Sequence, residues 1–265
     1  TSMMDRPHII YNKSTKKFVC WLKIMNKDGS QSETILTADH ILGPYKKVRE
    51  GLRPLNMSAG DFDLVVAPDG KAYYYFERVH SETICADLTA DYTDVTGYYT
   101  THFPTKYPPF VREATSHFVR KGKHYLVTSG TSGYLPNPSE VAIADTWHGP
   151  YTVLGNPHPK DESHTSYHSQ ISCVFKVEGK KDLYIAMADR WVPEHMEYKY
   201  EEYAKAFEQI FNPDYNGPVI DMMKNFGDDS RRNTSIADYV WLPFRFDGEM
   251  AYLDWRDEWK TEDFL

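Results

Sequence analysis

The sequence has few cysteines and no long apolar run. Its 3 cysteines (Cys20, Cys85 and Cys173) are an odd number and fall in separate segments. They therefore predict buried thiols and not a disulfide framework or a cysteine metal site. A run of 18 apolar residues is missing, so no transmembrane helix is predicted. The first residues show no signal-peptide pattern.

The charge balance excludes another class of partner. The formal net charge is −8 and basic residues form no cluster, which argues against nucleic-acid binding. A glycine-rich phosphate loop is also missing. Aromatic residues, by contrast, make up 15% of the chain, with 20 tyrosines and 6 tryptophans. This composition suits β-strands and the stacking of sugar rings.

A repeat of short strands organises the chain. In each copy a polar residue opens a short apolar strand, a turn rich in Gly or Lys follows, and an aromatic-rich strand comes next. The opening residues are Asp5, Asp61, Glu113 and Gln170, at steps of 56, 52 and 57 residues. A repeat of about 50 residues made of short strands is typical of a β-propeller with four strands per blade. The opening residues would then meet at one mouth of the central channel.

The repeat predicts a single all-β domain over residues 1–265. An insertion at about residues 194–233 interrupts the last blade, and Glu197–Phe211 within it has the spacing of a surface helix. That helix would cover the domain edge or cap the site. Four blades would expose strand edges, so we expect a fifth blade or a partner to cover them. The four predicted blades span residues 5–50, 59–103, 108–155 and 166–262.

Several short motifs lie along the chain. They include Asp5-Arg6-Pro7, Ala59-Gly60-Asp61, Arg112-Glu113-Ala114, Thr128-Ser129-Gly130, Ser169-Gln170, Ala188-Asp189-Arg190-Trp191 and Tyr239-Val240-Trp241-Leu242-Pro243. Taken together, these motifs resemble glycoside hydrolase family 43, in the branch of the exo-β-1,3-galactanases and related arabinofuranosidases and galactofuranosidases. The resemblance implies a five-bladed β-propeller, of which four blades are visible in this chain. It also implies an inverting exo-glycoside hydrolase that acts on O-glycosyl bonds of galactan or arabinogalactan.

The resemblance implies a role for each opening residue. Glu113 would be the general acid, Asp61 would orient it and raise its pKa, and Gln170 would help to place the attacking water. Asp5 would contact the substrate. Further substrate contacts are predicted from Asp63, Tyr134, His168, Arg190 and Trp191.

Structural roles compete with these catalytic ones. Asp5 and Arg6 could form a local salt bridge, Asp61 and Asp63 could cap a turn, and Asp189-Arg190-Trp191 could pack between blades. Strand alternation predicts that Arg112 points away from Glu113.

Departures from the branch keep alternatives open. Gly60 stands where the branch usually has Arg, and Tyr134 where Trp is common. The family's Asp base belongs to a first blade that would precede Asp5. The terminal sugar is therefore left as β-1,3-linked galactose, α-L-arabinofuranose or β-galactofuranose. The alternative function is a catalytically degenerate propeller that binds carbohydrate or protein.

The predicted partner is an oligosaccharide or polysaccharide substrate, with neither nucleic acid nor membrane. No cofactor is required. The family resemblance allows a structural Ca²⁺ on the propeller axis near a His such as His117 or His168, although the sequence has no ligand set with calcium spacing.

Overall fold

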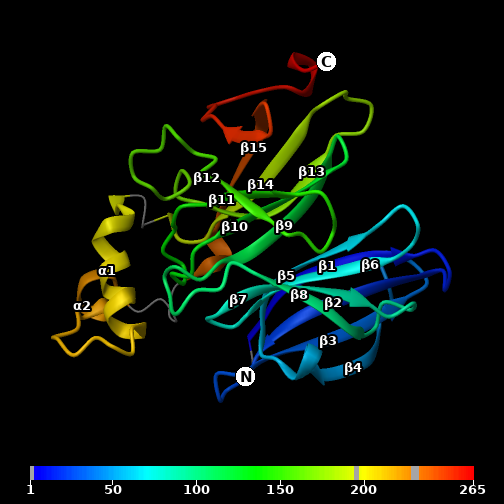
Figure 1. The fold of residues 1–265 in the computed structure, drawn as a ribbon, viewed down its shortest axis with the longest axis horizontal. Coiled ribbons are helices and arrows are strands. Elements are labelled where there is room, and N and C mark those ends of the chain that lie inside the picture. The colour runs from blue at the N-terminus through cyan, green and yellow to red at the C-terminus, as the bar shows by residue number, and fades with distance from the viewer. Residues whose placement is uncertain (1–2, 194–196, 228–232) are drawn as a thin grey trace.

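Four antiparallel sheets, each of four strands, follow one another along the chain (Figure 1). The computed structural model describes residues 3–193, 197–227 and 233–265. The first two sheets contain β1 (Met3–Asn12), β2 (Lys17–Met25), β3 (Gln31–Ala38), β4 (Lys46–Leu52), then β5 (Ala59–Val66), β6 (Ala72–Arg78), β7 (Glu82–Leu88) and β8 (Val95–His102). The third and fourth contain β9 (Glu113–Arg120), β10 (Lys123–Ser129), β11 (Glu140–Ala144), β12 (Thr152–Gly155), then β13 (Gln170–Lys176), β14 (Tyr184–Arg190), β15 (Asp238–Asp247) and β16 (Met250–Leu253).

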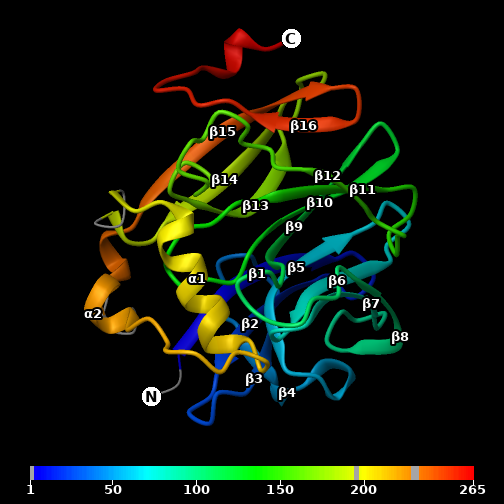
Figure 2. The same ribbon diagram turned by 60° about the vertical axis from the view of Figure 1, so that its left-hand side comes forward.

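The first strands of the sheets pack against one another around a common axis. Strand β9 lies between β5 and β13, and β5 also contacts β1. Successive sheets thus form the blades of a β-propeller (Figures 1 and 2). The predicted all-β propeller with four visible blades is confirmed, and β1, β5, β9 and β13 are its innermost strands.

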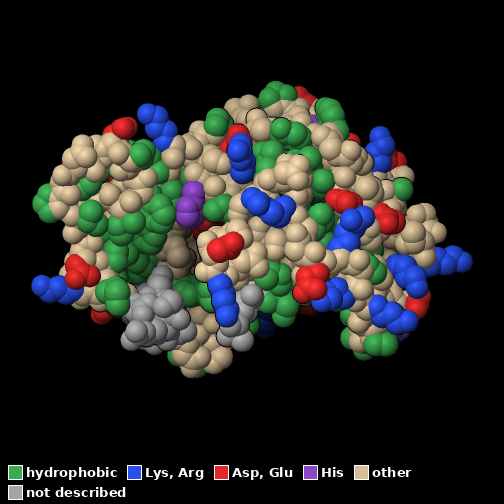
Figure 3. Space-filling view, turned by 90° about the horizontal axis from the view of Figure 1, so that it is seen from below, with side chains coloured by type: hydrophobic (Ala, Val, Ile, Leu, Met, Phe, Trp, Pro, Cys, Tyr) green, Lys and Arg blue, Asp and Glu red, His purple; other side chains and the backbone are tan. Residues whose placement is uncertain are grey.

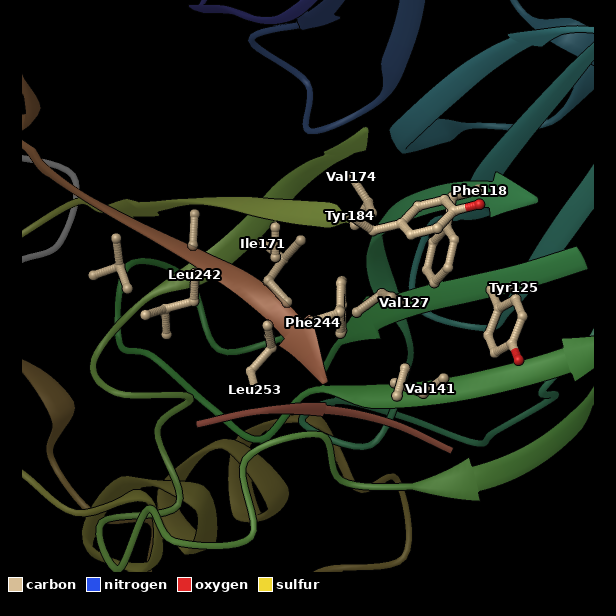
Figure 4. Packing of buried hydrophobic residues seen from close by; sticks show 14 of the residues in the cluster. Phe118, Tyr125, Val127, Val141, Ile171, Val174, Tyr184, Leu242, Phe244 and Leu253 are labelled. Carbon is tan, nitrogen blue, oxygen red and sulfur yellow. The ribbon is translucent and has the colours of Figure 1, made fainter. Parts of the chain in front are cut away.

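Hydrophobic clusters join the sheets in sequence. Trp21 and Tyr74 are fully buried between the first and second sheets, and Tyr75 and Leu126 are buried in a cluster between the second and third. Phe118 belongs to the largest cluster, between the third and fourth sheets, together with Tyr184 and Phe244 (Figure 4). Each large apolar side chain stabilises the fold by roughly 1.5–3 kcal/mol through burial. Truncating Trp21 to Ala would cost about 3–5 kcal/mol.

The first and fourth sheets each leave one apolar face open. Among the described residues, no hydrophobic cluster joins these two sheets. Ile9 and Tyr11 on β1 are 40% and 42% exposed, and Tyr239 and Trp241 on β15 are 67% and 46% exposed. They alternate with the buried side chains that pack on neighbouring sheets. The fifth blade or partner expected to cover such edges stays a prediction.

A β-bulge interrupts every innermost strand close to its start. The register shifts after Asp5 on β1, after Ala59 on β5, after Glu113 on β9 and after Ile171 on β13. Within two of these bulges Arg6 and Ala114 adopt positive φ angles of 50° and 49°. Because a bulge adds one unpaired residue and bends the strand, it redirects the side chains beside it. The bulges therefore set the directions in which the polar side chains at the strand starts point.

The predicted helical insertion lies between β14 and β15 and contains α1 (Tyr200–Phe211) and α2 (Met222–Phe226). Tyr203 of α1 is fully buried against Leu135 and Phe226, and its hydroxyl donates to the carbonyl of Pro136. The helix is therefore attached to the loop before β11. Residues 194–196 and 228–232 of the predicted insertion lie outside the described residues. Short 3₁₀ turns occur at Pro54–Asn56, Thr234–Ile236 and Thr261–Asp263.

The surface carries both signs of charge. On the face shown in Figure 3, Lys and Arg side chains are interspersed with Asp and Glu side chains. In the part of the chain that is described, no helix is both long and apolar enough to cross a membrane.

Candidate active site

The polar residues that open the innermost strands meet at one end of the axis, as the repeat predicted. The Arg6 Nη2 atom donates to Asp61 Oδ2 at 2.8 Å and to Gln170 Oε1 at 3.2 Å. The Gln170 Nε2 atom in turn donates to Glu113 Oε1 at 3.4 Å. These three contacts connect residues from all four sheets in one cluster.

Glu113 has the surroundings that a general acid needs. It begins β9, and its side chain keeps partial contact with solvent although it lies deep in the cluster. Burial, together with the negative charges of Asp61 and Glu77, raises the pKa of Glu113 well above its ordinary value. The charges of Lys23 and Arg6 oppose this effect but do not overcome it. These surroundings therefore favour the protonated form of the carboxyl group.

Asp61 is held as an anion by two cations. Its Oδ2 accepts from Arg6 at 2.8 Å, and its Oδ1 accepts from Lys23 Nζ at 2.6 Å. Burial alone would raise the pKa of Asp61, but the charges of Arg6 and Lys23 keep it well below the usual range. A permanent negative charge therefore lies beside Glu113.

The competing interpretation, a local salt bridge between Asp5 and Arg6, does not match the contacts of either residue. Arg6 pairs with Asp61, while Asp5 lies 3.6 Å from Lys23, its partner in the β1–β2 register. The bulge at Arg6 turns its side chain toward the axis and separates it from its neighbour. Lys23 is not among the predicted site residues, and its one signal in the sequence is that it is a lysine within the apolar run of β2.

The amide of Gln170 is oriented at both ends. Its oxygen accepts from Arg6, and its nitrogen donates to Ser129 Oγ at 2.9 Å as well as to Glu113 Oε1. Because Glu113 Oε1 accepts this bond, the proton of the acid belongs on Oε2. Arg6 and Ser129 thus fix which end of the amide faces the acid.

Asp63, a predicted substrate contact, is tied to its neighbours. Its Oδ2 accepts from the His117 N–H at 2.7 Å, and its Oδ1 lies 3.2 Å from His8 Nδ1. Burial raises the pKa of Asp63, and His8 opposes the shift. Asp63 on β5 is therefore connected to β1 through His8 and to β9 through His117.

Glu77 explains the glycine at position 60. It lies on β6 opposite the bulge of β5, and its Oε1 accepts from the His80 N–H at 2.7 Å. A Cβ added to Gly60 would lie 2.1 Å from Glu77 Oε2, so a side chain at position 60 requires Glu77 to move. Burial, with a contribution from Asp61, raises the pKa of Glu77 to about 7. Glu77 is not among the predicted site residues, because it lies in an aromatic-rich strand without a motif.

A small pocket opens beside Gln170 and holds three of the predicted substrate contacts. Tyr134, His168 and Trp191 line it together with Asp189, and the rings of Tyr134 and Trp191 lie 6.0 Å apart. Asp5, with 39% of its side chain exposed, is the more open carboxylate of the cluster. Aromatic rings beside polar groups suit a sugar, which has both apolar and hydroxyl-bearing faces.

The side chains of Arg190 and Arg112 both donate to backbone carbonyls. Arg190 donates to the carbonyls of Tyr167 and His168, at 2.8 and 3.3 Å, and so shapes the loop at the pocket. Arg112 is buried and donates to the carbonyl of Thr128 at 2.7 Å. Its Nε atom also lies 3.2 Å from Glu140 Oε2, so its contacts are structural. Among the described residues, no group of three or more His, Cys, Asp or Glu could hold a metal.

Comparisons with known proteins agree with this geometry. The family described as Glycosyl hydrolases family 43 matches residues 7–200 of the chain. No curated protein matches this chain.

Solved structures show the same fold. A family 43 β-1,3-galactosidase superposes with a TM-score of 0.76 at 27% identity, over 99% of this chain and 47% of its own. A second β-1,3-galactosidase, solved with galactodeoxynojirimycin, gives 0.75 at 23% identity, over 98% of this chain and 77% of its own. An exo-β-1,3-galactanase from Phanerochaete chrysosporium, solved with β-1,3-galactotriose, gives a TM-score of 0.71 at 19% identity, over 96% of this chain and 49% of its own. The chain thus spans about half the length of the first and third of these proteins.

Proposed function

The chain belongs to the glycosyl hydrolases of family 43, and from that premise we propose that it removes terminal sugars from galactan-type polysaccharides by hydrolysis with inversion. The sugar we favour is β-1,3-linked galactose. The observation that carries the proposal is one cluster in which Gln170 donates to Glu113 while Arg6 and Lys23 both donate to Asp61. These surroundings raise the pKa of Glu113 and lower the pKa of Asp61. Two carboxyl groups whose surroundings push their pKa values apart are typical of glycosidic bond hydrolysis.

The geometry supports a role for each group. Glu113 would donate its proton from Oε2 to the leaving oxygen, because its other oxygen accepts from Gln170. Asp61 would stay ionised and favour the return of a proton to Glu113 after each cycle. Gln170, fixed by Arg6 and Ser129, would hold the attacking water on the opposite side of the sugar.

Support for galactose comes from the pocket and from the neighbours. Tyr134 and Trp191 offer aromatic surface for the apolar face of a sugar, and Asp5 offers an exposed acceptor for its hydroxyls. The neighbouring structures include β-1,3-galactosidases and an exo-β-1,3-galactanase solved with β-1,3-galactotriose. Removal of arabinofuranose or galactofuranose is the next choice within the same chemistry.

The test is hydrolysis of a substrate panel by the wild-type protein and by Glu113→Gln. The panel contains β-1,3-galactobiose and aryl glycosides of β-galactopyranose, α-L-arabinofuranose and β-galactofuranose. We expect release of galactose from the disaccharide and its loss in the variant. Activity on a furanoside alone would change the sugar, and activity that Glu113→Gln leaves intact would remove Glu113 from its role.

A catalytically degenerate propeller is the second candidate. The observation that favours it is Gly60, where the carboxylate of Glu77 fills the space of a side chain. In that case the wild type would hydrolyse no member of the panel, and calorimetry would still detect binding of β-1,3-galactobiose.

A further inference from the structure

A second cavity lies at the end of the sheets that is remote from Glu113. Its volume is about 260 Å³, and three arginines, two aspartates, three phenylalanines and a proline line it. One of these arginines is Arg120, the last residue of β9, whereas Glu113 is the first. At about 3.3 Å per residue, the strand between them separates the two ends by roughly 20 Å. The cavity is therefore separate from the candidate active site.

Apolar side chains that are fixed in the fold form part of the cavity wall. Phe244 is buried in the cluster between the third and fourth sheets, and Phe246 packs against that cluster. The guanidinium of Arg120 lies 3.8 Å above the ring of Phe246. Lys180 Nζ donates to the carbonyl of Phe264 at 2.9 Å and so attaches the last segment to the loop before β14. Preformed apolar surface of this kind suits the carbon face of a sugar ring.

Both aspartates on the cavity wall are paired with cations. Arg120 donates to Asp182 through Nε and Nη2, at 2.8 and 2.6 Å. The Arg245 Nε atom donates to Asp254 Oδ2 at 2.6 Å, and Lys160 Nζ lies 3.0 Å from Asp254 Oδ1. The negative charge of each carboxylate is therefore balanced by a cation.

Arg256 and Arg245 bring further N–H donors to the cavity. The guanidinium of Arg256 lies 5.7 Å from the ring of Phe264, its side chain is exposed, and among the described residues no carboxylate forms an ion pair with it. Arg245 is 49% exposed and uses Nε for Asp254, which leaves its two terminal nitrogens for another acceptor. Asp247 acts on the charge of Arg245 but does not line the cavity. Because a guanidinium presents several N–H donors in a planar fork, it matches a carboxylate.

We propose that this cavity binds a hexuronate unit of an acidic polysaccharide; the choice of a sugar acid rests on the proposed function. Arg245 and Arg256 would bind the carboxylate, and the phenylalanine wall would contact the carbon face of the ring. A neutral sugar would use the wall alone, and an inorganic anion would use the arginines alone. The volume, near the lower limit of about 300 Å³ for ligand pockets, restricts the ligand to about one sugar unit. Because the cavity is remote from Glu113, it would hold a polymeric substrate at a second point.

Calorimetric titration of the full chain tests the binding with three probes, which are methyl β-glucuronide, methyl β-glucoside and inorganic phosphate. We expect the glucuronide to bind the wild type, and to bind Arg256→Gln about tenfold more weakly because a charge-assisted hydrogen bond is lost. Arg256 has no ion partner among the described residues, so its replacement should leave the fold intact. Arg53→Gln is the matched control, since Arg53 is an exposed arginine between the first and second sheets, and it should bind as the wild type does.

Each other result of the titration overturns the assignment. Glucoside that binds as tightly as glucuronide would show that the carboxylate is not recognised. Phosphate that binds as tightly would show that the sugar ring is not recognised. A wild type that does not bind the glucuronide, or an Arg256→Gln variant that binds it as tightly as the wild type, would remove the site.

Hydrolysis separates this proposal from the proposed function. On β-1,3-galactobiose, which is too short to span the two sites, Arg256→Gln should have the kcat and KM of the wild type. On a β-1,3-galactan that carries hexuronate side units it should raise KM by about three- to tenfold at unchanged kcat, and an equal KM would refute a role in holding substrate. If the wild type hydrolyses nothing while glucuronide binding depends on Arg256, the proposed function fails and the site stands. Hydrolysis without glucuronide binding overturns the site alone.

Discussion

Arg6 lies between Asp61 and Gln170, with its Nη2 atom 2.8 Å from Asp61 Oδ2 and 3.2 Å from Gln170 Oε1. One guanidinium therefore neutralises the ionised carboxylate and orients the amide. It also connects β1 to β5 and to β13, although no hydrophobic cluster of described residues joins the first and fourth sheets. The geometry of the cluster depends on this side chain.

Replacing Arg6 by Lys should impair turnover more than folding. A lysine keeps the positive charge but lacks the planar group that reaches two acceptors from one position. The Gln170 amide would lose its fixed orientation, and misplacement of about 1 Å can cost on the order of 10²-fold in rate. We expect kcat to fall by about 10–100-fold while the thermal midpoint shifts by a few degrees. Equal kcat for Arg6→Lys and wild type would contradict this role.

Replacing Asp61 by Asn should change the pH dependence of hydrolysis. Asp61 repels the anionic form of Glu113 and so raises its pKa. In the variant the repulsion from Asp61 is lost, although the repulsion from Glu77 remains. Arg6 and Lys23 also lose their carboxylate partner and attract the anionic form of Glu113 more strongly. Both changes favour ionised Glu113, so the pKa of Glu113 falls. We expect the alkaline limb of the kcat/KM profile to move to lower pH, and a shift to higher pH would refute the argument.

The buried carboxyl group of Glu33 should make the stability of the protein depend on pH. Its Oε1 accepts from the Tyr74 hydroxyl at 2.9 Å, and its Oε2 has no hydrogen-bond partner among the described residues. Burial raises the pKa of Glu33 from 4.5 to about 8. Between these pH values the folded protein binds more protons than the unfolded chain, so stability falls as pH rises through this window.

The Glu33→Gln variant tests that prediction, because the amide resembles the protonated acid. Urea unfolding should give similar stabilities for the variant and wild type near pH 5. Near pH 8.5 the variant should be more stable by about 2–5 kcal/mol. The exposed control Glu162→Gln should follow the wild type at both pH values. A variant that loses stability with pH as steeply as the wild type would disprove the assignment.

Gly60→Ala should destabilise the protein through one contact. The new Cβ would lie 2.1 Å from Glu77 Oε2, and Glu77 is held in place by the His80 N–H. We expect a loss of about 1–3 kcal/mol in the free energy of unfolding. Glu77→Asp shortens the side chain, so the double variant should lose less than the sum of the two single ones. Additive losses would show that the clash is relieved in another way.

The sequence predicted the parts of the site that recur with the blades. Asp5, Asp61, Glu113 and Gln170 could be found because each opens an innermost strand at a regular step. The propeller follows from the same repeat, and the helix of the insertion follows from its apolar spacing. These features depend on local pattern, which a sequence displays directly.

The supporting residues could not be predicted in this way. Lys23 and Glu77 come from second strands, where a charged residue in a strand gives no sign of its partner. The direction of Arg6 depends on a bulge and a positive φ angle, which alternation does not foresee. For the same reason the competing interpretation paired Arg6 with Asp5, whereas the partners of Arg6 lie 55 and 164 residues away.

The central claim is that Glu113 supplies the proton to the leaving oxygen, and leaving-group dependence tests it most directly. The measurement compares wild type and Glu113→Gln on β-1,3-galactobiose and on 2,4-dinitrophenyl β-galactopyranoside, whose leaving group needs no proton. We predict a loss of about 10²–10⁴-fold on the disaccharide and a loss of less than about tenfold on the activated glycoside. Equal losses on both substrates, or none on the disaccharide, would contradict the account.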